Sequence, residues 1–170
     1  NMLAALMVLR SGLSPFVTVN TGGYDTHASH LSGHIPLMQG FASRLATLVA
    51  DMQITPDPTD SSLMLSDTTT IFITSEFTRT PLFNIADGTD HWPTASAIVM
   101  GKGVADNAVI GATGDDAYAL GWSDGQPRTF DKATNALMPE HVVASVLDIL
   151  GVPQDTINAL TTVRLDELRA

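Results

Sequence analysis

One short run constrains the fold of this 170-residue chain more than any other: Thr69–Thr74 (TTIFIT) is almost entirely apolar or β-branched. Such a run is typical of a strand that is buried on both faces of a sheet. Ser96–Met100 (SAIVM) has the same character, and Pro15–Asn20 (PFVTVN) is short and β-branched, so both are predicted as strands. A fourth short strand is predicted at Ala108–Ile110.

Helical patterns alternate with these strands. An opening apolar helix is expected to end near Gly12, and Ile35–Met52 has apolar residues at intervals of three and four. Pro139–Leu150 is predicted as a helix, a final short one is predicted at Asp155–Leu160, and a hairpin at Asp124-Gly125. Helices that alternate with buried strands predict an α/β fold with a largely parallel sheet flanked by helices.

Composition excludes several classes of protein. The formal net charge is -10 and the chain has no Lys/Arg cluster, which argues against nucleic acid or an anionic membrane as a partner. No run of about 20 apolar residues is present, so no membrane span is expected. Cysteine is absent, which removes disulfides, thiolate metal sites and a cysteine nucleophile. Most of the acids are Asp in predicted loops, where Asp favours turns and solubility.

Polar side chains follow the predicted strands, and the first candidate pair is Asp25 with His27 in YDTH. In a parallel sheet, ligands gather at the carboxyl ends of strands. A carboxylate and an imidazole placed there can bind a divalent cation. The alternative is that Asp25 makes a turn bond to backbone N–H groups and His27 is a solvated loop residue.

Glu76 directly follows the buried strand in SEFTRTP, an odd place for an acid unless it binds a ligand or pairs with Arg79. Arg79 can instead contact an anionic substrate group, because its guanidinium matches phosphate or sulfate oxygens. Both interpretations stay open from the residues alone.

The segment Asp90-His91-Trp92 is the most specific local feature. A histidine oriented by a carboxylate and walled by an aromatic ring is how metal-ligand shells are built, although a packed surface turn has the same composition. Of the other histidines, His30 or His34 is expected to cap the following helix and His141 to be a solvated helix residue. No GxSxG elbow and no HExxH motif are present.

Four ordered motifs resemble a known bacterial family. GGYDTH, SEFTRTP, GTDHWP with MGKGV, and VIGAT are similar to the motifs of the family catalogued as domain of unknown function 1501, over roughly Gly22 to Val152. That family looks like a divergent branch of the alkaline phosphatase and sulfatase superfamily. The resemblance implies an alkaline phosphatase-like fold, of which residues 1–170 are either a single α/β domain or the C-terminal part of a larger domain.

The resemblance also implies a function. Superfamily members hydrolyse phosphate or sulfate esters with metal ions and a Ser/Thr nucleophile, and that nucleophile is expected upstream of this segment. Asp25, with His27 or His30, resembles the first ligand pair, Glu76 the strand-end carboxylate, and His91 the last histidine ligand. The implied cofactor is a divalent ion, either zinc, calcium or magnesium, and Arg79 is the candidate for holding the anion.

Partners and location follow from the same resemblance. The expected substrate is a small anionic ester or sugar ester, and the expected location is the periplasm or cell envelope, because family members often carry a twin-arginine export signal. The missing N-terminal part or a second copy of the chain is the expected protein partner. The alternative function is a non-catalytic, envelope-associated binding module on the same fold.

Overall fold

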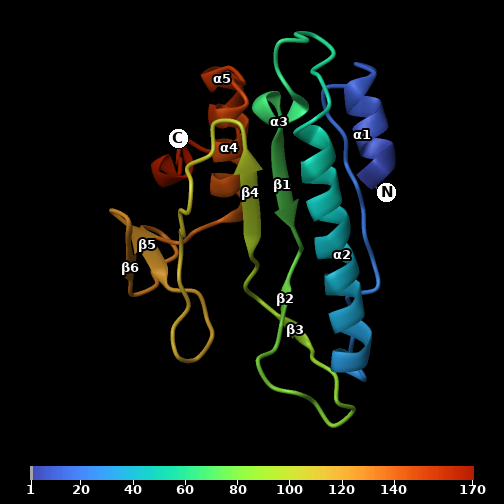
Figure 1. Ribbon diagram of the computed structural model, residues 1–170. Coiled ribbons are helices and arrows are strands. Elements are labelled where there is room, and N and C mark those ends of the chain that lie inside the picture. The colour runs from blue at the N-terminus through green and yellow to red at the C-terminus, as the bar shows by residue number, and fades with distance from the viewer. Residues whose placement is uncertain (1) are drawn as a thin grey trace. The chain divides into compact units, whose positions relative to one another are not determined.

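The computed structural model describes residues 2–170, which form two compact units. Unit 1 runs to Thr69 and also includes Arg79–Trp92, whereas unit 2 consists of Thr70–Thr78 and Pro93–Ala170. Figure 1 shows helices together with small antiparallel sheets, so the predicted mixed α/β class is confirmed at that level. Whether the chain is one domain or part of a larger one stays a prediction.

The described residues of unit 1 form three helices: α1 (Met2–Arg10), α2 (His30–Met52) and α3 (Leu65–Thr68). In Figure 1 α1 lies alongside α2, and Ala5 and Leu6 of α1 are buried. Burial of such apolar side chains supplies most of the stability of short helices, which are marginal on their own in water. No helix among the described residues is both long and apolar enough to cross a membrane.

The helix boundaries test two sequence predictions. The first helix ends as predicted, because Gly12 adopts the left-handed φ of 69° that terminates helices. The second helix begins at His30 rather than at Ile35. The backbone N–H of His30 donates to the carbonyl of Asp87 at 2.8 Å. The first N–H groups of a helix have no acceptor within the helix, and here a residue distant in the sequence supplies one.

Strands β1 (Thr70–Thr74) and β4 (Ala97–Gly101) form the main sheet of unit 2, with Phe72 opposite Val99. They pair antiparallel, and so the prediction of a largely parallel sheet was wrong for these strands. A parallel pair needs a crossover, usually a helix, whereas residues 75–96 contain no helix and the chain simply turns back. Phe72 is 37% exposed, so β1 is not buried on both faces.

Two other predicted strands are not strands in the structure. Pro15–Asn20 and Ala108–Ile110 are both irregular. A β-branched run forms a strand only where it can lie on a pleated, half-buried surface, and Phe16 is 74% exposed. Neither segment belongs to a sheet in the part of the chain that the structure describes. The site that was expected at the end of the first strand is therefore carried by a loop.

The predicted hairpin is confirmed: β5 (Gly121–Ser123) pairs antiparallel with β6 (Gln126–Arg128) around Asp124 and Gly125. The central residues have φ values of 54° and 68°. Two positive φ angles in a two-residue loop are the mark of a type I′ turn, for which Asp-Gly is a preferred sequence.

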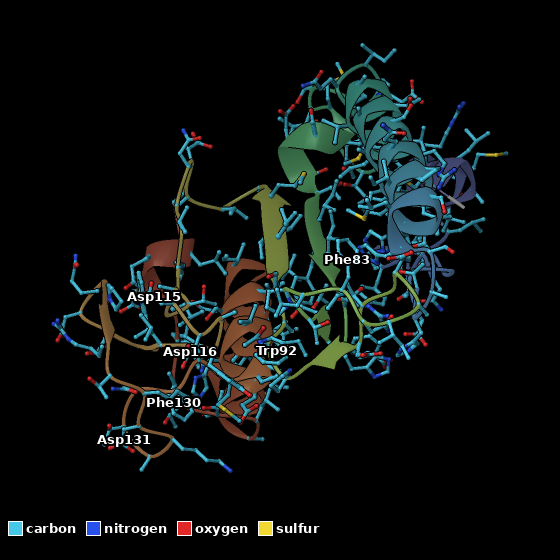
Figure 2. The ribbon with its side chains drawn as sticks, turned by 90° about the horizontal axis from the view of Figure 1, so that it is seen from below. Phe83, Trp92, Asp115, Asp116, Phe130 and Asp131 are labelled. Atoms are coloured by element: carbon cyan, nitrogen blue, oxygen red, sulfur yellow. The ribbon has the colours of Figure 1, made fainter. Side chains whose placement is uncertain are left out.

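The C-terminal part of unit 2 contains α4 (Pro139–Ile149), α5 (Gln154–Asn158) and a 3-10 helix, η1 (Asp166–Leu168), so the predicted last two helices are confirmed within a few residues. Ala144 of α4 and Ile157 of α5 are almost fully buried. Acidic side chains lie both in these elements, as Asp148 does in α4, and in the loops of unit 2. Figure 2 labels three exposed ones in the loops of unit 2: Asp115, Asp116 and Asp131.

A third, very short sheet pairs β2 (Thr78–Arg79) with β3 (His91–Trp92). The backbone N–H of Thr80 continues this pairing by donating to the carbonyl of Asp90 at 2.8 Å. The sheet matters because it brings Arg79 and His91, two of the residues singled out in the sequence, onto neighbouring strands.

Candidate metal centre

Two segments of unit 1, distant in the sequence, carry the candidate site. Residues 24–29 precede α2, and residues 84–90 lead into β3, whose first residue is His91. A backbone hydrogen bond joins them, from the N–H of Thr89 to the carbonyl of Thr26 at 3.1 Å. Because such bonds fix both backbones, side chains from either segment are held facing one another.

The two segments approach one another closely at Gly88, which is buried. A Cβ atom on this residue would lie only 1.9 Å from the carbonyl oxygen of His27. Glycine is therefore required here for a close approach of two backbones. This contact fixes the position of the chain at His27.

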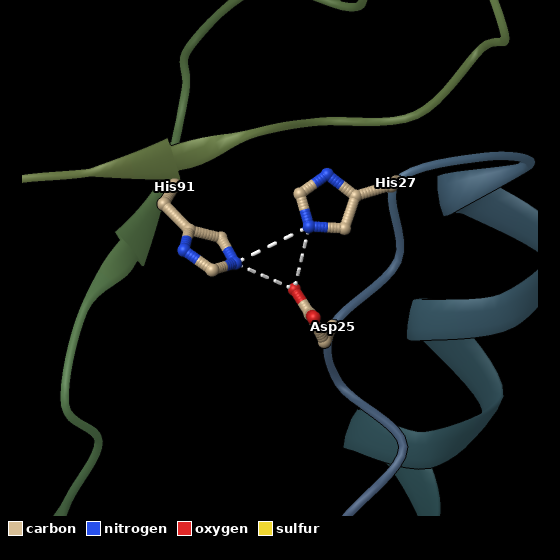
Figure 3. A group of neighbouring side chains, drawn as sticks. All are labelled: Asp25, His27 and His91. Atoms are coloured by element: carbon tan, nitrogen blue, oxygen red, sulfur yellow. Dashed lines mark hydrogen bonds and ion pairs between the residues drawn. The ribbon is translucent and has the colours of Figure 1, made fainter.

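Asp25, His27 and His91 form a triangle of possible metal ligands, shown in Figure 3. Oδ1 of Asp25 lies 3.0 Å from Nε2 of His27 and 2.9 Å from Nε2 of His91. The two Nε2 atoms are 3.2 Å apart. The side chains are about half exposed, so solvent and small molecules can reach all three.

The ring of His27 is oriented by Asp90, whose Oδ1 lies 2.8 Å from Nδ1 of the imidazole. An ionised carboxylate only accepts hydrogen bonds, so Nδ1 must carry the proton. In the neutral imidazole this leaves Nε2 with its lone pair, and Nε2 is the atom that faces Asp25. A carboxylate that fixes the tautomer of a histidine in this way is typical of metal sites.

Arg79 holds the carboxylate of Asp25. Its Nη1 donates to the same Oδ1 at 2.5 Å, while its Nε donates to the hydroxyl of Thr89 and its Nη2 to the Thr89 carbonyl. The Arg79 side chain is only 12% exposed, so the guanidinium is shielded from solvent, while the carboxylate that it binds is 58% exposed. The prediction that Arg79 contacts a substrate anion stays a prediction, but in the structure the guanidinium binds Asp25 and Thr89.

Both carboxylates of the site are held in the ionised form. Hydrogen bonds from His91 and Arg79 lower the pKa of Asp25 below its ordinary value. The hydrogen bond from His27 lowers the pKa of Asp90 in the same way. An oxygen of an ionised carboxylate has more than one lone pair, so Asp25 can accept from Arg79 and still bind a cation.

The spacing of the three atoms fits a metal ion. Zinc ligands at 2.0–2.1 Å and at the tetrahedral angle lie about 3.3 Å from one another. The triangle has sides of 2.9, 3.0 and 3.2 Å. With a neutral His27, the triangle presents lone pairs of His27 and Asp25 to each other at close range, and a cation between them removes that repulsion. Three protein ligands leave a fourth position open, as in catalytic zinc sites.

The other candidate residues have different surroundings. Glu76 is exposed and belongs to unit 2, and its role as a ligand stays a prediction. His30 does not cap α2; its Nδ1 lies 2.6 Å from the hydroxyl of Thr26, and burial lowers its pKa. His141 is not simply solvated, because its Nδ1 accepts from the backbone N–H of Met138 at the start of α4.

Sequence reasoning missed some of the residues that organise the site. One of the two interpretations of the Asp90-His91-Trp92 segment has a carboxylate orient His91, whereas in the structure Asp90 binds the ring of His27. Thr89 and Asn84 were not singled out. The composition of Asn84–Gly88 (NIADG) does signal a turn, but a turn signal does not reveal the distant partner that the turn contacts.

Comparison with known protein families places this chain in a family. The model of a family described as "Protein of unknown function (DUF1501)" matches residues 1–141. That range contains every residue of the triangle. No curated protein and no solved structure matches the chain.

Proposed function

The chain belongs to the DUF1501 family, and from this premise we propose that it is a metal-dependent hydrolase of phosphate or sulfate esters whose metal ion is held by Asp25, His27 and His91. The observation that carries the proposal is the triangle itself. Two imidazole nitrogens and one carboxylate oxygen converge within 3.2 Å, and Asp90 fixes the tautomer of His27 that leaves Nε2 free to bind a cation.

The ligand types favour zinc among the three ions that the sequence suggested. Calcium and magnesium prefer oxygen ligands, whereas imidazole suits zinc and neighbouring transition metals. When bound in such a site, zinc polarises an ester oxygen and lowers the pKa of a coordinated water. Exposure of all three side chains supports access by a substrate.

The kind of substrate rests on the ordered motifs rather than on the triangle. Their similarity to the alkaline phosphatase and sulfatase superfamily supports a small anionic ester, such as a sugar ester, and an exported protein of the periplasm or cell envelope. In this proposal Arg79 acts on the chemistry by holding Asp25, and the nucleophile comes from outside this segment.

Metal binding is the first test. Zinc titration of the metal-free chain against a chromophoric chelator is expected to give one tight site, and His91→Ala is expected to abolish it. His141→Ala is the matched control, because His141 lies on α4 of unit 2 and should leave zinc affinity unchanged. A wild-type chain that binds no zinc would overturn the proposal.

Hydrolysis is the second test. The zinc-loaded protein is screened with aryl phosphate and aryl sulfate esters, and turnover that is lost in His91→Ala supports the hydrolase. Tight zinc binding without turnover of either ester, in a preparation that includes any upstream part of the natural protein, would favour the non-catalytic binding module instead. The two tests therefore separate the metal site from the reaction.

A further inference from the structure

Asn84 makes four hydrogen bonds beside the triangle, although it is not a candidate ligand. Its Nδ2 donates to the carbonyl of His27 at 3.1 Å and to Oδ1 of Asp90 at 3.2 Å. Its Oδ1 accepts from the backbone N–H groups of Ala86 at 2.9 Å and Gly88 at 3.0 Å. The partly buried amide thus uses both of its donor hydrogens and both lone pairs.

The two ends of this amide do different things. The oxygen closes the turn that contains Ala86 and Gly88, which is a local role that Asn commonly has in loops. The nitrogen reaches across to the other segment, and it contacts the backbone and the orienting carboxylate of the same histidine. Only the nitrogen connects Asn84 to the triangle.

The oxygen of Asp90 that Asn84 contacts is the one that accepts from Nδ1 of His27. Asn84 therefore fixes both ends of the His27–Asp90 hydrogen bond: the carboxylate directly and the histidine through its backbone. With that bond fixed, Nδ1 stays protonated and Nε2 keeps its lone pair toward Asp25, at 3.0 Å.

We propose that Asn84 is a positioning residue of the metal site, which holds His27 in the tautomer and orientation that a metal ligand needs. The proposal rests on the function proposed above, but its first consequence concerns the metal-free protein. Residues outside the ligand set that orient a ligand commonly change metal affinity by 10–100-fold when they are mutated.

Asn84→Ser separates the two ends of the amide. The serine hydroxyl can still accept from a backbone N–H two residues ahead and keep the turn, but it is too short to reach His27 or Asp90. Asn135→Ser in unit 2 is the matched control. Asn135 also donates to a carbonyl, that of Thr129, and accepts from a backbone N–H, that of Asp131.

Two readouts test the proposal. The ¹⁵N chemical shifts of the His27 ring report its tautomer in the metal-free chain, and a chelator competition gives the zinc dissociation constant. For Asn84→Ser we expect a mixture of His27 tautomers and a zinc affinity about 10–100-fold weaker. For Asn135→Ser we expect a lower melting temperature and neither of these changes. Should Asn84→Ser fail to fold, Asn84→Thr also keeps an uncharged hydroxyl acceptor for the turn and loses both amide donors, and its His27 ring shifts answer the same question.

The outcomes distinguish this inference from the function on which it rests. An Asn84→Ser variant that keeps the wild-type His27 tautomer and zinc affinity overturns the positioning role, whatever the reaction. A wild-type chain that binds no zinc, together with a changed His27 tautomer in Asn84→Ser, overturns the metal site and leaves Asn84 as the residue that orients His27. If the wild-type chain binds no zinc and Asn84→Ser keeps the wild-type His27 tautomer, both proposals fail.

Discussion

Two carboxylates in loops of unit 1 have opposite surroundings. Asp57 is about nine-tenths buried, and its oxygens accept from the hydroxyls of Thr59 and Thr68 and from the backbone N–H groups of Thr59 and Asp60. Asp25 is more than half exposed, and one of its oxygens faces nitrogens of Arg79 and of two histidines. Donors satisfy the oxygens of the first carboxylate, whereas the second also faces the lone pair on Nε2 of His27.

The difference separates a structural acid from a ligand. A carboxylate surrounded by O–H and N–H donors has its lone pairs satisfied and stabilises a loop. A carboxylate beside a histidine nitrogen that carries a lone pair is stabilised further by a cation. The partner atoms, and not the residue type or its place in a loop, decide between these roles.

The largest effect on stability is expected from Gly88→Ala, which disrupts the backbone contact beside the Asp25 site and does not alter the Asp57 loop. The added Cβ would meet the carbonyl of His27 at 1.9 Å, so the backbone must shift. We expect the free energy of unfolding to fall by more than about 3 kcal/mol, measured by denaturant titration. Gly22→Ala is the control, because a Cβ there meets no atom within 4 Å. Equal losses for both variants would contradict this explanation.

The next effect is on metal affinity. His27→Ala removes one of three ligands, and the zinc dissociation constant should rise more than about 100-fold, beyond the range for orienting residues. Asp57→Ala should leave that constant unchanged and lower the melting temperature instead. Isothermal titration calorimetry and thermal melts of both variants measure the two properties. An Asp57→Ala variant with weakened zinc binding would show that the two loops are not independent.

Acid should protonate both carboxylates and remove their contribution to the free energy of unfolding, whereas bound zinc should affect only Asp25. Hydrogen bonds from Thr59 and Thr68 lower the pKa of Asp57, and those from His91 and Arg79 lower that of Asp25. A lowered pKa stabilises the fold above the unfolded value, about 3.9, and this contribution is lost as the pH falls through the folded value. We therefore expect the free energy of unfolding of Asp57→Asn to fall less steeply than that of the wild type below about pH 4, with or without zinc.

The smallest effect is expected from His30, whose pKa is lowered chiefly by burial. A histidine that stays neutral when folded stabilises the fold above its unfolded pKa of about 6.5, and this contribution is lost as the pH falls through the folded pKa. His30→Gln should make the loss of unfolding free energy between pH 7 and pH 5 slightly smaller, measured by urea titration at each pH. An unchanged pH profile would assign the sensitivity to other groups.

Local signals predicted the elements that depend on local chemistry. The end of α1 at Gly12 and the hairpin at Asp124 follow from turn and cap preferences of a few residues, and both are confirmed. Pro15–Asn20 has the composition of a strand and is irregular, because a strand requires a distant partner that composition does not supply.

The candidate site shows the same division between local and distant information. Asp25, His27 and His91 could be named from their residue types and motif positions, and the structure brings their ligand atoms together. Asn84 could not, because its role depends on a contact with His27 across 57 positions of the chain. Hydrogen bonds between distant segments have no periodicity that a single sequence reveals.

The positions of the ligands in the chain have a mechanical consequence. His27 and His91 are separated by 64 positions, and the chain has no cysteine. An ion bound to both would act as a removable cross-link, closing a long loop much as a disulfide does and reducing the conformational freedom of the unfolded chain. The melting temperature would then rise with the logarithm of the free metal concentration. The stability of the fold would thus depend on how much metal its surroundings contain.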